Sequence, residues 1–123
     1  MPGGGVPVTQ PAREIDIARN IRTIEWLKSE LIGGTATLCK AMLKGSQELI
    51  RDALAGIIMT SYLLGRRIGI SFSKMDTRLA EKLAGNIAEP HEIEEWYGDF
   101  SALKTYLEDK ERGEPSVNRG LVR

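Results

Sequence analysis

Residues 17–46 read IARNIRTIEWLKSELIGGTATLCKAMLKGS, and this stretch decides the fold. Its apolar residues recur at three- and four-residue intervals, which is the spacing of one helix face. They are Ile17, Ile21, Ile24, Leu31, Leu38 and Met42. The phase continues across Gly33-Gly34, although two glycines inside a helix cost roughly 2 kcal/mol relative to alanine. Because the phase is unbroken, the sequence predicts one long helix rather than two helices that break at the glycines.

A second helix is expected directly after the first. Gly45 is a suitable C-terminal glycine for the long helix, and Ser46 is a suitable N-cap for the next. That next helix is predicted over Gln47–Arg67, with Gly69 behind its end. Its residues 53–64, ALAGIIMTSYLL, are apolar on more than one face, so the helix has to be covered on several sides. We therefore expect the chain to form a homodimer or homotetramer.

The remaining elements are also expected to be helical. A third helix is predicted over Lys74–Ala88, with Ser73 as its cap and Pro90 behind its end. A turn containing the solvent-exposed His91 should lead to a last helix capped by Asp99 or Ser101. No segment alternates with the period of a strand. The sequence thus predicts an all-α bundle of four or five helices, with a core that oligomerisation completes.

The chain of 123 residues is expected to hold one helical domain over residues 13–112, between a Gly- and Pro-rich tail at 1–12 and a second tail at 113–123. One cysteine, Cys39, excludes an internal disulfide. Cys39 and the single His91 are too few for a structural zinc site, which needs four ligands. Cys39 is expected to be a small apolar residue on a helix.

Charge and hydropathy exclude further classes. Seventeen basic residues balance seventeen acidic residues, so the chain lacks the positive field that non-specific nucleic-acid binding requires. The longest apolar run, residues 53–64, is too short for a bilayer span of roughly 20 residues. The N-terminus does not have the pattern of a signal peptide. We expect a cytoplasmic protein that binds neither nucleic acid nor membrane.

Two short segments carry a resemblance to a known family. They are AMLKG at residues 41–45 and LGRRIGI at residues 64–70. In this order, and with a third helix after them, they resemble the MazG-like branch of the all-α nucleotide pyrophosphohydrolases. The resemblance extends over residues 17–86. It implies a helical bundle that cleaves nucleoside triphosphates with magnesium, held by Glu-x-x-Glu on one helix and Glu-x-x-Asp on the next.

The residues at these ligand positions are not acidic. Aligned on the two segments, the four positions fall on Gly34, Thr37, Ala53 and Gly56. Magnesium requires oxygen ligands, so the departure predicts a chain without a metal cofactor and without metal-dependent hydrolysis. Small residues on facing helices either let the two backbones pack closely where the family has a metal cavity or leave a cavity that accepts a different ligand. Close packing is favoured, since empty volume costs stability.

Part of the resemblance survives on the third helix. Lys82 and Asn86 stand four residues apart, where the family's Lys and Asn face substrate phosphates, and Arg66 is a third candidate for holding phosphate. These residues make a nucleotide or another phosphate the candidate ligand of an oligomeric binding or regulatory module. Two alternatives remain open at this point. One is an active pyrophosphohydrolase that holds magnesium with the displaced acids Glu30, Glu48 and Asp52; the other is a purely structural helical interaction protein.

Overall fold

The computed structural model describes residues 10–89 and 91–113, and within them it contains five α-helices and no strand. The predicted all-α fold is therefore confirmed. The chain divides after Phe72 into two compact units, each described here by itself. The first unit holds α1 (Gln10–Lys44) and α2 (Gln47–Arg67), and the second holds nearly all of α3 (Phe72–Ala88) together with α4 (Glu92–Tyr97) and α5 (Asp99–Glu111).

Helix α1 is continuous through Gly33-Gly34, as the unbroken apolar phase predicts. Its 35 residues correspond to a rod of about 52 Å. The helix begins at Gln10, inside the segment expected to be a tail, with Pro11 in the first turn, where a missing N–H costs least. Residues 1–9 and 114–123 of the predicted tails lie outside the described residues, and the single domain over 13–112 stays a prediction.

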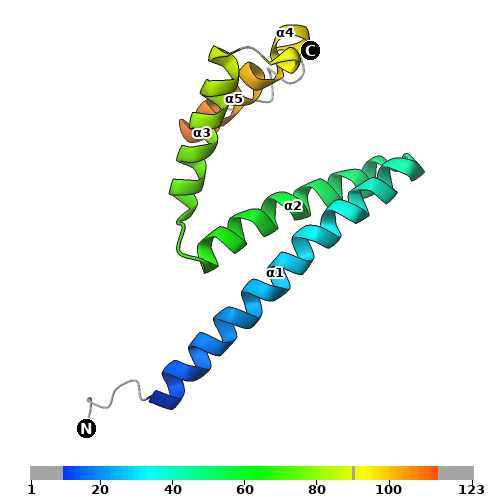
Figure 1. The fold of residues 1–123 in the computed structure, drawn as a ribbon. Coiled ribbons are helices and arrows are strands. Elements are labelled where there is room, and N and C mark those ends of the chain that lie inside the picture. The colour runs from blue at the N-terminus through cyan, green and yellow to red at the C-terminus, as the bar shows by residue number, and fades with distance from the viewer. Residues whose placement is uncertain (1–9, 90, 114–123) are drawn as a thin grey trace. The chain divides into compact units, whose positions relative to one another are not determined.

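The link between α1 and α2 is short and locally encoded. Gly45 adopts a φ of 69°, which a residue with a Cβ rarely adopts, and its N–H donates to the Ala41 carbonyl at 3.0 Å. The Ser46 side chain then accepts from the Leu49 N–H at 3.2 Å and caps α2. The predicted bounds Gln47–Arg67 are confirmed. With only two residues between them, the helices fold back side by side as an antiparallel hairpin (Figure 1).

The seam of this hairpin pairs large side chains with small ones. Counting outward from the turn, α1 and α2 present facing positions at alternating three- and four-residue steps, the spacing of a coiled-coil seam. These positions are all buried or half-buried: Leu27 with Leu64, Leu31 with Thr60, Gly34 with Ile57, Leu38 with Ala53, and Ala41 with Ile50. Four of the five pairs set a bulky residue against a small one. At Gly34 a Cβ would lie 3.3 Å from Ile57 Cγ1, which is closer than an ordinary van der Waals contact.

The end of α2 satisfies its own carbonyls. Gly69 has a φ of 96°, its N–H donates to the Arg66 carbonyl, and the Ile70 N–H donates to the Gly65 carbonyl at 2.8 Å. This pair of bonds is a Schellman motif. The predicted role of Gly69 behind the helix end is confirmed.

The start of α3 differs from the prediction. Ser73 was expected to cap the helix from outside, whereas α3 begins at Phe72 and includes Ser73. The ring of Phe72 stands edge-on to Tyr62 at 6.0 Å, and the Arg66 guanidinium lies 5.0 Å from its centre. These contacts with α2 hold the first residue of α3, and propensity alone does not reveal them.

Side chains cap or brace the starts of α4 and α5. His91 is exposed, as expected, but the segment after it, expected to be a turn, forms the short helix α4. The His91 Nδ1 accepts from the Ile93 N–H at 3.1 Å and caps this helix. The residue before α5 is Gly98, which has no side chain to cap it, so neither Asp99 nor Ser101 is its N-cap. Glu94 takes over this role: its Oε1 accepts from the Ser101 N–H at 3.1 Å, and the Ser101 hydroxyl donates to its Oε2.

The seam predicts a contrast between two neighbouring glycines. Gly34→Leu inserts a side chain against Ile57 and should lower the free energy of unfolding by about 1–3 kcal/mol. Gly33→Leu is the matched control, since nothing lies within 4 Å of a Cβ there, and helix propensity should raise stability by up to about 1 kcal/mol. Urea unfolding followed by circular dichroism, at one protein concentration, measures both. Equal effects would contradict the proposed seam.

The cap of α5 predicts a pH dependence. Hydrogen bonding from Ser101 holds the pKa of Glu94 below its ordinary value of 4.5. A lowered folded-state pKa gives stability that is present above 4.5 and lost as the pH falls through the lowered value. Ser101→Ala should therefore raise the Glu94 pKa in an NMR titration and speed amide exchange in α5 at neutral pH. At a pH well below the folded-state value the two proteins should exchange alike, and a difference that persists there would count against this cap.

Candidate functional site

The four positions where the family resemblance expects metal ligands lie along the α1–α2 seam. Gly34 faces Ile57, and Ala53 is buried. Thr37 is exposed, and Gly56 is half-buried with no atom within 4 Å of its Cβ position. Two of the four positions are thus filled by packing between the helices, and none of the four carries an anionic oxygen. The arrangement offers no donor set for magnesium at these positions.

The displaced acids do not form a cluster. Glu30, Glu48 and Asp52 are all exposed, and Glu48 lies 3.8 Å from Arg51 in an i,i+3 ion pair. Within residues 10–89 and 91–113, no group of three or more His, Cys, Asp and Glu side chains is placed to hold a metal ion. Cys39, which sequence reasoning treated as a small apolar helix residue, is an exposed free thiol on α1.

The three candidate phosphate ligands fall in different units. Lys82 is exposed and Asn86 half-buried, one turn apart on α3 in the second unit. Arg66 lies in the last turn of α2 in the first unit.

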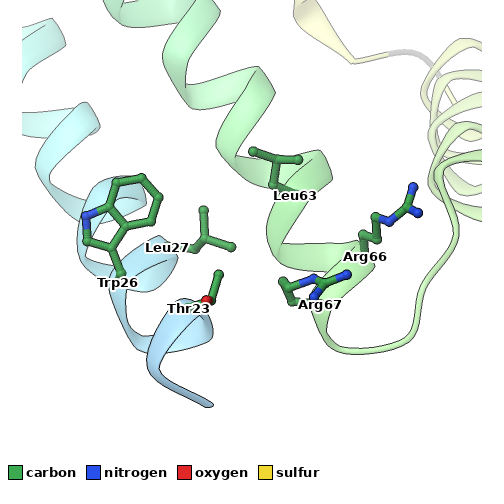
Figure 2. Close-up of a pocket in the computed structure, with 6 residues that line it drawn as sticks. All are labelled: Thr23, Trp26, Leu27, Leu63, Arg66 and Arg67. Carbon is green, nitrogen blue, oxygen red and sulfur yellow. The ribbon is translucent and has the colours of Figure 1, made fainter. Parts of the chain in front are cut away.

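The first unit contains a pocket that the sequence did not predict as a site. It has a volume of about 340 Å³ and is lined by Thr23, Trp26, Leu27, Leu63, Arg66 and Arg67. Figure 2 shows Leu27 and Leu63 between the indole of Trp26 on one side and the two arginines on the other. The pocket thus has a mainly apolar lining, with an aromatic side chain at one edge and two arginines at the other.

Both arginines are positioned by neighbours and not by acids. The Arg66 guanidinium lies over the Phe72 ring, and Arg67 Nη1 donates to Asn20 Oδ1 at 3.4 Å. Among the described residues, neither arginine forms an ion pair with a carboxylate. A guanidinium has five N–H donors, so most of those on Arg67 stay available.

The end of α2 does not need these guanidinium groups as hydrogen-bond donors. Cationic side chains at a helix C-terminus often serve the last carbonyls. Here backbone N–H groups bond the carbonyls of residues 64–66, and Asn20 Nδ2 donates to the Arg67 carbonyl at 3.3 Å. The favourable charge–dipole interaction remains, but the donors of both arginines are left for another acceptor.

Sequence reasoning missed Trp26 and Leu63 as site residues because it considered each helix alone, and it attributed Arg67 to the charge complement of the α2 C-terminus. The signal lies in the two-residue turn. Once α2 folds back at Gly45, residues 23–27 of α1 must lie opposite residues 63–67 of α2. Pairing the two helices outward from the turn would have brought this set together.

No helix in the described part of the chain is long and apolar enough to cross a membrane.

The MazG-like family matches residues 17–100 of the chain. Comparison with curated proteins found no match, and comparison with solved structures also found none. The matched range covers the seam, the pocket and both candidate phosphate ligands of α3. Because it covers more than half of the 123 residues, the chain belongs to the MazG-like family.

Proposed function

We propose that this chain is an oligomeric binding module of the MazG-like family that has lost magnesium-dependent pyrophosphohydrolase chemistry. The observation that carries the proposal is the contact between Gly34 and Ile57. A side chain at position 34 would begin 3.3 Å from Ile57 Cγ1, so Ile57 would have to shift to admit a carboxylate. The position expected to hold a metal ligand is therefore part of the packing that joins α1 to α2.

Displaced acids are a poor substitute for the missing ligands. Magnesium bound to a triphosphate needs carboxylates at short distances in a near-octahedral array. Glu30 precedes Gly34 by four residues, about 6 Å along the helix axis, and the Glu48 carboxylate faces Arg51. This geometry favours solvated surface acids over a metal centre, and it is the reason for preferring a binding module to an enzyme.

Purified protein should release no pyrophosphate from nucleoside or deoxynucleoside triphosphates in the presence of Mg²⁺. Loss of one electrostatic stabiliser costs an enzyme on the order of 10²–10³-fold, and here all four metal-ligand positions lack a carboxylate. Calorimetry with Mn²⁺ should likewise show no specific binding. Mg²⁺-dependent release that Glu30→Gln, Glu48→Gln or Asp52→Asn abolishes would overturn the proposal in favour of the displaced-acid enzyme.

Lys82 and Asn86 are the proposed phosphate ligands of the second unit. They stand one turn apart on α3, so an ammonium and a side-chain amide share one helix face. Two such groups hold a phosphate weakly and in a salt-sensitive way, since binding needs only charge and donors. Arg66, on α2, is proposed to contribute to anion binding in the first unit. If the chain bound no anion in either unit, the purely structural alternative would be favoured.

Self-association is proposed because the hairpin leaves much apolar surface uncovered. In the described residues the buried apolar side chains are only Leu27, Ala41 and Ala53 in the hairpin and Leu83 in the second unit. An isolated two-helix hairpin with so few core residues is marginally stable. A second copy of the chain is the occupant that we propose for the exposed apolar surface.

One side of the hairpin suits such a partner better than the other. Residues that flank the seam on the side away from the pocket form an aliphatic face: Ile32, Thr35, Cys39, Met42, Leu54 and Ile58. The same side also carries the charged residues Lys28 and Arg51. The pocket side carries Glu30, Lys40, Asp52 and Arg66 at the corresponding flanking positions. Because buried unpaired charge is costly, we assign the aliphatic face to the contact between copies.

Ile58 and Met59 test this assignment as a matched pair. Both are apolar residues of α2, 60% and 61% exposed, and as successive residues they lie about 100° apart around the helix, on either side of the direction away from the seam. Ile58→Asp should dissociate the oligomer in light scattering, whereas Met59→Asp should leave its mass unchanged. A wild-type species of 13.6 kDa at micromolar concentration would exclude self-association. Dissociation by Met59→Asp alone would place the contact on the pocket side.

A further inference from the structure

We propose that the pocket between α1 and α2 binds a small organic anion with a flat apolar body, such as an aromatic phosphomonoester or carboxylate. The inference deepens the proposed binding function by naming the ligand class that the first unit takes. It concerns a site separate from Lys82 and Asn86, which lie in the second unit.

The anionic group is assigned to the arginines. Arg67 is held by Asn20, which accepts from its guanidinium and also donates to its backbone carbonyl. A tethered guanidinium loses less side-chain freedom on binding, and its planar fork matches two oxygens of a carboxylate or phosphate. Arg66 also lines the pocket, but its guanidinium points away from Leu27 and Leu63 (Figure 2). That guanidinium lies 5.0 Å from the centre of the Phe72 ring, so Arg67 is the principal candidate for the anion.

The flat apolar body is assigned to the opposite wall. Trp26 lines the pocket although 57% of its surface is exposed, so its ring is accessible to a ligand. Leu27 is buried beneath it, and Leu63 flanks the floor from α2. A planar ring that stacks on the indole and covers Leu63 removes apolar surface from water, while its anion stays with the arginines.

The location of the pocket keeps it independent of self-association. It lies on one side of the seam, whereas the aliphatic face lies on the other. A volume of about 340 Å³ suits one or two fused rings with a single anionic group. Larger ligands would extend into solvent or along the seam toward Thr37 and Gly56.

NMR on the full chain tests the proposal with 1-naphthyl phosphate as the probe. The chain has two tryptophans, one at the pocket and one, Trp96, in the second unit. The Trp26 indole signal should shift on titration while the Trp96 signal stays in place, and Trp96→Phe assigns the two signals. Neutral 1-naphthol and inorganic phosphate should each bind at least about tenfold more weakly in the same Trp26 titration. Naphthol lacks the anionic group, and phosphate lacks the aromatic ring.

Substitutions test the two walls separately. Arg67→Gln should weaken binding of the probe by about tenfold, and Arg66→Gln by less, since one charge-assisted hydrogen bond contributes about that factor. Arg51→Gln is the matched control, because it removes the same charge from an exposed site on the same helix. Trp26→Ala should weaken binding, and Trp26→Phe should restore much of it. Circular dichroism verifies that each variant stays helical.

The outcomes separate this inference from the proposed function. Equal binding of 1-naphthol and 1-naphthyl phosphate, or equal loss in Arg51→Gln and Arg67→Gln, would overturn the anion pocket. Release of pyrophosphate would instead overturn the proposal that the chain has lost hydrolase activity. It would not affect the conclusion drawn from the Trp26 titration. Probe-dependent shifts at Trp96 alone would exclude the pocket and point to the second unit.

Discussion

The close approach of Gly34 to Ile57 is the contact on which the first unit depends. A side chain as small as a single Cβ at position 34 already meets Ile57 Cγ1 at 3.3 Å. In four of the five facing pairs a bulky residue on one helix faces a small residue on the other, and this complementarity lets the two helices pack closely with a thin core. Gly34 and Ala53, at two of the four positions where the resemblance expects metal ligands, belong to this packing. Thr37 is exposed, and Gly56 has no atom within 4 Å of its Cβ position.

This reverses the usual relation between a metal site and its scaffold. A site built from carboxylates on facing helices keeps those helices apart and needs the ion to neutralise the charge between them. In this chain Gly34 and Ala53, at two of these positions, pack between the helices, and none of the four positions carries a charge. The pocket lined by Trp26 and Arg67 lies about two helical turns further along α1 from Gly34.

Sequence reasoning succeeded where the signal is local. Gly45 with Ser46 sets the turn, Gly69 ends α2, and the apolar phase carries α1 through its glycines, because caps and periodicity act within a few residues. It failed where a contact between residues of different helices determines the local structure. Phe72 starts α3 through ring contacts with α2, Glu94 caps α5 from seven residues away, and the pocket exists only once two helices are paired.

The unequal lengths of α1 and α2 have a consequence for how the protein opens. When residues are paired outward from the turn, the end of α2 lies opposite Ile24. Residues 10–19 of α1 therefore extend past the last turn of α2. An isolated helix of that length is marginal in water, and Ile15 and Ile17 are half exposed. Unwinding should start at this overhang and stop at the seam. Arg13 and Arg19 lie within it, so trypsin would trim the first helix from its free end while the hairpin and its pocket stay intact.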